Sequence, residues 1–302
     1  MTSPSESRAR SRAIGGMKFG DHLCLPYDND LERRSALFTF VSDGLAQGHK
    51  VVYVSDGVAP DAVLGWLREE PEADLVDFDD ALKNDHLVIL PAESAYLATG
   101  RFDPDEIVAL FGTHLEMALL QDHSGLRLTC EKTFSLRGWP GSDRFAEFEE
   151  KIEQIFQTMP VSAMALCQYD TRWFGRRSLE RLLAVHAGGN ARVDDVHDDG
   201  TLRIAPRFTP PGLSLHGTIE ESSLPALSGA LATLAERTDL LCLDLSGVGF
   251  CDMAGLRLLL DARISAEGRE RQVMLREVPE SIVELLRAAG WEGLPGLYVE
   301  EG

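Results

Sequence analysis

The 302-residue sequence lacks several features that would each define a class of protein. No apolar run approaches the roughly 18 residues that a membrane-spanning helix needs, so we expect no membrane segment. The Ser- and Arg-rich residues 1–12 are not followed by an apolar stretch, which argues against a secretory signal. We therefore expect a cytoplasmic protein with a short disordered tail over residues 1–16.

Cysteine is also scarce. The five cysteines are odd in number and form no CxxC pair, which is typical of reduced thiols rather than of a disulfide framework. Most of them are expected to be small buried side chains.

Positive charge is in short supply. Lys and Arg number 29 against 49 Asp and Glu, which gives a net charge of −20. Nucleic acid and anionic membranes would be repelled by this surplus, so neither is expected as a partner. The charge favours solubility and basic protein partners.

The sequence does contain a repeated alternation of strand and helix signals. Its length is typical of about two domains, and its hydrophobic content of 44% is ample for two cores. Residues 51–54, VVYV, are of the kind that is buried on both faces of a parallel sheet. The alternation predicts an α/β fold with a doubly wound, mostly parallel sheet. The strands expected in that sheet are residues 23–25, 51–54, 87–90, 126–130 and 161–167.

A polar, turn-rich stretch divides the chain. Residues 188–200 are rich in glycine and aspartate, which is typical of a linker. We therefore expect a first domain over residues 17–187 and a second domain over residues 201–302. The second domain has the element order β-β-α-β-α-β-α.

Chemically distinctive side chains accompany the predicted strands of the first domain. In an open α/β sheet, ligands bind at the carboxyl ends of the strands. We expect an apolar pocket there, in which His22, Glu131 and Asp170 are polar anchors for a small molecule of unknown identity. The candidate ligand-binding residues are His22, Cys24, Tyr27, Glu131, Cys167, Tyr169 and Asp170.

A soft metal site is one alternative for these residues. Cys24, Cys130 and Cys167 with His22 could supply its ligands. Cysteines that alternate with apolar residues on buried strands usually belong to the core, so we expect neither a metal nor a cofactor. His186 is assigned no role.

Two further alternatives remain open. In a structural network, a buried Glu131 would pair with Lys132 or Arg137. In a catalytic site, Cys167 would be the nucleophile and His22 the base. Nothing in the spacing supports catalysis, so we assign no catalytic residue and do not expect an enzyme.

Four segments of the first domain carry a family resemblance. They are residues 20–27 (GDHLCLPY), 44–54 (GLAQGHKVVYV), 131–138 (EKTFSLRG) and 166–170 (LCQYD). Together they resemble the MEDS domain, a sensory domain of methanogen and methylotroph regulators. The resemblance implies that residues 17–187 sense a ligand, proposed for the family to be a simple hydrocarbon derivative.

The order strand, loop, helix, GLxxG, strand is similar to circadian-clock-type RecA ATPases, which implies a RecA-like fold. In those proteins the loop after the first strand is a P-loop that cradles phosphate. Here the loop at 26–30, PYDND, has no glycine, and Arg33 and Arg34 stand where Lys and Thr would. Asp28 and Asp30 would repel phosphate. The P-loop is therefore degenerate, and we expect no ATP hydrolysis.

Residues 251–256, CDMAGL, follow a buried strand at 240–245 and open a helix. This arrangement resembles the switch loop of STAS domains, the anti-sigma-factor-antagonist fold, over about residues 201–300. The resemblance implies a STAS-type α/β domain with a mixed sheet. The family pattern is Asp-Ser-(Ser/Thr)-Gly-Leu, in which a partner kinase phosphorylates the Ser. Met253 and Ala254 have no hydroxyl and cannot accept phosphate.

The two resemblances together predict a cytoplasmic signal-transduction regulator. A ligand-sensing domain would control a STAS domain that binds an anti-sigma factor or a related serine-kinase-like protein. The contact would use the switch loop, which comprises Asp252, Met253, Ala254 and Gly255. A homodimer is compatible with this interpretation. Two alternatives remain open: a RecA-like regulator that binds nucleotide without turnover, and a STAS-based scaffold or assembly protein.

Overall fold

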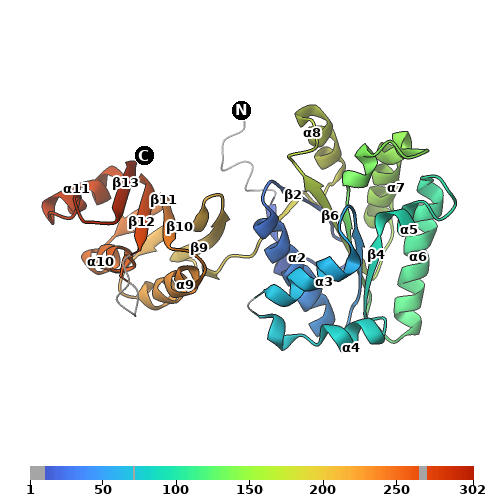
Figure 1. The fold of residues 1–302 in the computed structure, drawn as a ribbon, viewed down its shortest axis with the longest axis horizontal. Helices are drawn as coiled ribbons and strands as arrows, with labels where there is room; N and C mark the ends of the chain where they lie inside the picture. Colours follow the sequence, from blue (N-terminus) through green and yellow to red (C-terminus); the bar gives the residue numbers. More distant parts are fainter. Residues whose placement is uncertain (1–10, 71, 265–270) are drawn as a thin grey trace. The chain divides into compact units, whose positions relative to one another are not determined.

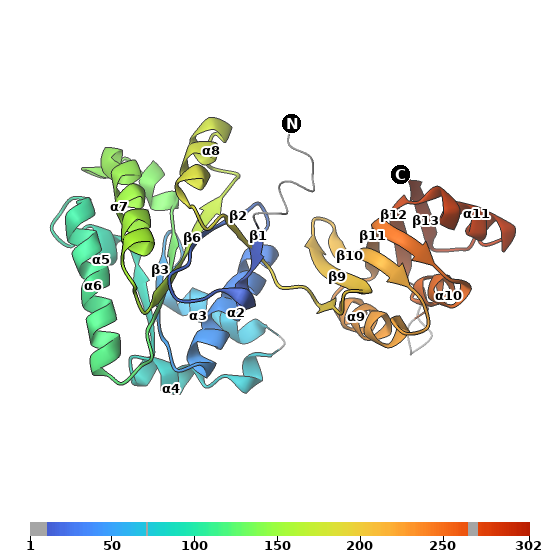
Figure 2. The same ribbon diagram turned by 180° about the vertical axis from the view of Figure 1, so that it is seen from behind.

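The computed structural model describes residues 11–70, 72–264 and 271–302 (Figures 1 and 2). The chain divides into two compact units, the first ending at Val193 and the second beginning at Asp194. This division falls inside the expected linker. Among the described residues, no helix combines the length and apolar character required to cross a bilayer.

Both ends of the expected linker take part in sheets. Strand β7 (Asn190–Arg192) belongs to the first unit and β8 (His197–Asp198) to the second. The tail expected over residues 1–16 is wrong at its C-terminal end, where Ser11–Ala13 form strand β1. The physical reason is Ile14, which follows β1 and is fully buried in the core. The rest of that tail, residues 1–10, lies outside the described residues.

The described part of the first unit forms a seven-stranded parallel sheet in the order β1-β7-β2-β6-β5-β3-β4. The prediction of a doubly wound, parallel α/β fold is confirmed. The longer strands are β2 (His22–Tyr27), β3 (Lys50–Ser55), β4 (Leu87–Pro91), β5 (Leu126–Glu131) and β6 (Ala163–Asp170). The helices are α2 (Asp30–Ala46), α3 (Pro60–Glu69), α4 (Phe78–Lys83), α5 (Ala92–Tyr96), α6 (Pro104–Leu120), α7 (Phe145–Thr158) and α8 (Arg176–Val185).

Two separate apolar cores lie on the two faces of this sheet. Helices α2, α3 and α4 cover one face, and α5, α6 and α7 cover the other, as Figure 1 shows. Successive residues of a strand point to opposite faces. Leu23 and Leu25 therefore enter the α2/α3 core, whereas Cys24 enters the α6/α7 core.

A buried arginine ties β5 to α2 and β3. Arg127 is almost fully buried, and it donates to the Phe40 carbonyl at 3.1 Å and to His49 Nδ1 at 3.0 Å. Burial, followed by the Arg127 charge, lowers the pKa of His49 to about 4. His49 must therefore stay neutral to keep this contact.

We expect the first unit to lose stability as the pH falls from about 6.5 to about 4. The pKa of His49 is lower in the folded chain, so the unfolded chain binds more protons within this window. For one such group, the free energy of unfolding changes by at most about 1.4 kcal/mol per pH unit. Urea unfolding at several pH values measures this pH dependence of the free energy of unfolding. Hydrogen exchange of β3 and β5 amides reports it for the first unit specifically.

His49→Gln should flatten that slope, because a glutamine oxygen can still accept from Arg127. His197→Gln, in the second unit, is the control and should leave the slope unchanged. An identical slope in wild type and His49→Gln would contradict the assignment.

The second unit contains a six-stranded mixed sheet in the order β13-β12-β11-β10-β9-β8. Strands β8 to β10 pair antiparallel and β10 to β13 pair parallel, which confirms the predicted mixed sheet. In the described part of this unit, three helices contribute to one apolar core. The remaining elements are β9 (Leu202–Phe208), β10 (Pro211–Ile219), α9 (Leu224–Arg237), β11 (Leu240–Cys251), α10 (Met253–Asp261), β12 (Gln272–Val278), α11 (Glu280–Ala288) and β13 (Leu297–Glu301).

Strand β11 is longer than the sequence predicts. The strand expected from the sequence ends at residue 245, but β11 continues to Cys251 beside β10. A Cβ atom at Gly247 would lie only 1.8 Å from His216 Nδ1 of β10. Glycine at this position therefore allows close strand contact rather than a turn.

Candidate functional site

The sheet of the first unit separates the predicted ligand-binding residues. Tyr27, Glu131 and Asp170 belong to the side of the sheet that faces α2, whereas His22 belongs to the opposite side. His22 is also the first residue of β2, while Glu131 and Asp170 end their strands. The expected convergence of His22 with Glu131 and Asp170 is therefore wrong. The other three predicted residues, Cys24, Cys167 and Tyr169, lie on the same side of the sheet as His22.

Glu131 is the centre of the network on the α2 side. It accepts hydrogen bonds from the Tyr53 hydroxyl at 2.8 Å and from the Asp56 amide at 3.1 Å. Its ion-pair partner is Arg33, at 3.5 Å, which also donates to the Tyr27 hydroxyl at 3.2 Å. Burial raises the pKa of the Glu131 carboxyl, and the Arg33 charge moderates that rise.

The pairing predicted for Glu131 with Lys132 or Arg137 is wrong. Lys132 points to the other face of the sheet, where it pairs with Glu149, and Arg137 pairs with Asp56. Alternation along the chain explains the first difference, because neighbouring residues at the end of β5 point to opposite faces.

The loop between β2 and α2, where the sequence predicts a degenerate P-loop, is occupied by its own side chains. Asn29 caps α2 by accepting from the amides of Leu31 and Glu32. At the end of β6, Arg172 bridges Asp170 and Asp30 at 2.7 Å to each. Helix amides that would otherwise be available to a phosphate already have a partner.

A second polar network lies buried on the other side of the sheet. Its centre, which we call the buried His–Cys–Glu cluster, comprises His22, Glu149, Cys167 and His186. One potential ligand atom from each of these residues lies within 4.8 Å of all the others. His22 Nε2 is 3.2 Å from Cys167 Sγ, and His186 Nε2 is 3.5 Å from Glu149 Oε2.

Two charged side chains flank this cluster. Lys132 Nζ lies 2.9 Å from Glu149 Oε1, and Glu153 Oε2 lies 2.7 Å from His22 Nδ1. Glu149 is fully buried and Lys132 nearly so.

Three members of this network had no site role predicted from the sequence, and the alternative metal site considered there included two cysteines that lie outside the cluster. Cys24 bonds to Asn190 Oδ1 instead, and Cys130 packs in the apolar core. The missed residues are Glu149, Glu153 and His186. A signal for the two acids existed: they lie four residues apart within the apolar stripe of α7, where a carboxylate needs a buried partner.

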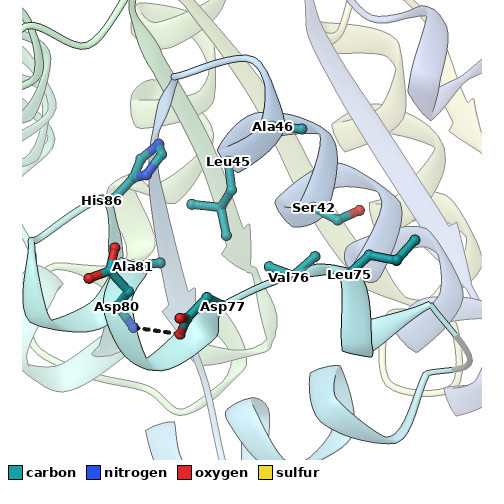
Figure 3. A pocket seen from close by; sticks show the side chains of 9 residues that line it. All are labelled: Ser42, Leu45, Ala46, Leu75, Val76, Asp77, Asp80, Ala81 and His86. Carbon is teal, nitrogen blue, oxygen red and sulfur yellow. Dashed lines mark hydrogen bonds between the residues drawn. The ribbon is translucent and has the colours of Figure 1, made fainter.

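The hollow drawn in Figure 3 lies away from both networks. It is bounded by α2, α4 and the start of β4, and Asp77 there accepts from the Asp80 amide at 2.9 Å. His86 precedes β4, so this hollow is at the amino end of the strand rather than at the carboxyl end expected for a ligand. Its lining comprises Ser42, Leu45, Ala46, Leu75, Val76, Asp77, Asp80, Ala81 and His86.

The switch loop of the second unit begins α10. Asp252 is its N-cap, and the Asp252 carboxylate accepts from the Gly255 amide at 2.7 Å. Met253 and Ala254 are exposed, whereas Gly255 is buried. A Cβ atom at Gly255 would lie 2.5 Å from Ile219 Cγ2, so the backbone approaches β10 closely here.

These features agree with two known families. Residues 21–187 match the family model described as MEDS, MEthanogen/methylotroph, DcmR Sensory domain, over more than half of the chain. The chain belongs to the MEDS family. Residues 203–298 match the model described as Mlab, STAS domain. A MEDS sensory domain joined to a STAS domain supports a role in signalling or regulation.

Two solved structures resemble parts of the chain. An anti-sigma factor antagonist from Mycobacterium paratuberculosis is 22% identical, with coverage of 35% of this chain and 82% of its own and a TM-score of 0.27. A KaiC-like protein from Pyrococcus horikoshii OT3 is 16% identical, with coverage of 60% and 74% and a TM-score of 0.39. Among curated proteins, none matches this chain.

Proposed function

We propose that the protein is a regulator in which the MEDS domain senses a small molecule and the STAS domain binds a protein partner. The partner would be an anti-sigma factor or a related serine-kinase-like protein. The observation that carries the proposal is the surface at the start of α10. Phe250 and Met253 are 53% and 44% exposed on either side of the Asp252 cap. Large apolar side chains exposed at a helix start suit a protein contact.

The composition of this loop supports constant readiness to bind. A phosphate would add about −1.5 to −2 charges beside Asp252. Met253 and Ala254 cannot carry one, so the loop keeps its unphosphorylated charge. Control of the partner then passes to the MEDS domain.

We further propose that the protein is not an enzyme. Cys167 is buried, and burial raises the pKa of its thiol well above the usual value, so it is a poor nucleophile. Arg33 is held by Glu131 and Tyr27 rather than being available to a nucleotide phosphate.

Titration calorimetry with the cognate anti-sigma factor tests the partner surface. Met253→Asp should weaken binding at least tenfold, or about 1.4 kcal/mol, because it places a second carboxylate beside Asp252 in the contact. Tyr298→Asp is a matched control, because Tyr298 is half-exposed on β13 of the same domain. Equal affinities for both variants would overturn the assignment of this surface.

A phosphorylation assay tests the fixed state of the loop. After incubation with the partner kinase and ATP, wild type should carry no phosphate on residues 246–257. Met253→Ser should gain it. Stoichiometric phosphate on Ser246 of wild type would contradict the proposal.

A further inference from the structure

We propose that the buried His–Cys–Glu cluster of the MEDS domain binds one divalent transition-metal ion, with zinc as the best fit. His22 and His186 would each supply Nε2, Cys167 its sulfur and Glu149 a carboxylate oxygen. The four side chains come from the start of β2, from β6, from α7 and from the residue after α8. This site is independent of the partner surface proposed above.

The spacing of the ligand atoms fits tetrahedral coordination. Zinc binds nitrogen and oxygen at about 2.0–2.2 Å and sulfur at about 2.3 Å, which sets neighbouring ligand atoms about 3.3–3.7 Å apart. His22 Nε2 and Cys167 Sγ are 3.2 Å apart, and His186 Nε2 and Glu149 Oε2 are 3.5 Å apart. All four atoms lie within 4.8 Å of one another, so small side-chain shifts would close the tetrahedron.

Both histidines have an acceptor behind Nδ1, as a metal-bound imidazole needs. The other ring nitrogen of His186, Nδ1, lies 3.0 Å from the Leu182 carbonyl, which can only accept a hydrogen bond. His22 Nδ1 lies 2.7 Å from the Glu153 carboxylate. Each Nδ1 therefore acts as a donor to a group outside the cluster, and each Nε2 is directed toward the cluster. A carboxylate or carbonyl behind a histidine is the usual support of a metal-bound imidazole.

The contact of His186 Nδ1 with the Leu182 carbonyl turns Nε2 toward Glu149. His186 Nε2 has no hydrogen-bond partner among the residues that the structure describes, and it faces the Glu149 carboxylate, which also lies beside Lys132 and the Tyr169 hydroxyl. The His186 and Glu149 side chains are fully buried, where an unpaired polar atom costs free energy. A cation between Nε2 and the carboxylate would satisfy both.

The local charges also favour a dication. Lys132 alone balances only one of the two carboxylates, Glu149 and Glu153. A divalent ion adds two positive charges, and Cys167 loses its thiol proton to solvent as its sulfur binds the ion. The net charge of Lys132, Glu149, Glu153, the Cys167 thiolate and the ion is then zero.

The donor set and the burial indicate the kind of site. Two imidazoles, one thiolate and one carboxylate suit zinc, and four protein ligands without solvent access are typical of a structural site. None of the residues in α8 is buried. An ion held by His186 would therefore fasten the end of α8 to the sheet.

Metal analysis and cobalt substitution test the site in the full-length protein. Elemental analysis of protein expressed with Zn²⁺ should find one ion per chain. Protein expressed in minimal medium with Co²⁺ should show a thiolate-to-cobalt charge-transfer band and the intense visible bands of tetrahedral cobalt. The stoichiometric zinc and these cobalt bands should both disappear in Cys167→Ser.

Two neighbouring cysteines provide matched controls. Cys24→Ser and Cys130→Ser should keep one ion and the cobalt spectrum, because their sulfurs lie outside the cluster. A spectrum retained by Cys167→Ser, or lost equally in Cys24→Ser, would overturn the assignment. So would wild type without stoichiometric metal, since a metal-free His22–Glu153 ion pair would then explain the network. X-ray absorption of zinc-loaded wild type, which should show one sulfur among nitrogen and oxygen ligands, keeps the test decisive if Cys167→Ser fails to fold.

Glu153→Gln tests the support behind His22. Loss of such a partner lowers metal affinity roughly 10–100-fold, so zinc should bind that much more weakly while the cobalt spectrum keeps its tetrahedral form. An unchanged zinc affinity would show that Glu153 does not position His22 for an ion.

Discussion

Lys132→Met should lower the free energy of unfolding of the MEDS domain by about 3–5 kcal/mol in chelator-treated buffer. The lysine is the nearest cation to Glu149, and both side chains are buried. Burial alone would raise the pKa of Glu149, but the Lys132 charge and its hydrogen bond counteract burial, and that pKa lies below its usual value. Without the lysine, an ionised carboxylate remains in an apolar core.

Urea denaturation of the full chain measures this loss. Lys151→Met is the control, because Lys151 pairs with Asp105 and Glu147 at the surface, where ion pairs contribute little to stability. The double variant Lys132→Met/Glu149→Gln should recover part of the stability, since it removes the stranded charge. A loss for Lys132→Met no larger than for Lys151→Met would mean that the pair is not a buried ion pair.

The second large effect is expected at two adjacent arginines. Arg33→Met should destabilise the MEDS domain by about 3 kcal/mol or more, because it strands the buried carboxylate of Glu131. Arg34→Met should cost about 1 kcal/mol or less. Among the residues that the structure describes, Arg34 pairs with the exposed Glu69 alone, and it lies over the Trp66 ring. Methionine preserves most of the side-chain volume in both variants.

The same pair of variants distinguishes a structural arginine from a nucleotide ligand. Neither wild type nor Arg34→Met should hydrolyse ATP in a steady-state assay. Turnover in wild type that disappears in Arg33→Met, while hydrogen exchange shows the fold intact, would restore a nucleotide site to this loop.

The parallel sheet was predictable because its strands are short apolar runs, which bury both faces and leave little ambiguity. Residues 51–54 and 126–130 fall within β3 and β5. The extension of β11 was not predictable in the same way. Its glycines are typical of a turn, and only the presence of His216 on the neighbouring strand explains them.

The candidate site was harder to predict than the fold. Alternation along β2 already places Cys24 and Tyr27 on opposite faces of the sheet. The sequence alone could therefore have excluded a single pocket that contains both. The partnership of Arg33 with Glu131 joins residues far apart in sequence, and only the packing of α2 on the sheet reveals it. His186 continues the stripe of Leu179, Leu182 and Leu183, which pack against the α6/α7 core, so its burial was predictable. Its approach to Glu149 was not, because α7 lies far away in sequence.

The short strand β1 bears on how the MEDS domain can be trimmed for study. Ser11–Ala13 pair in register with Asn190–Arg192, so this segment covers the outer edge of β7. A fragment that starts at residue 21, where the family match begins, would present a bare strand edge to solvent. Uncovered edges are templates for pairing between molecules, so such a fragment is expected to self-associate, whereas one that starts before residue 11 keeps its edge protected.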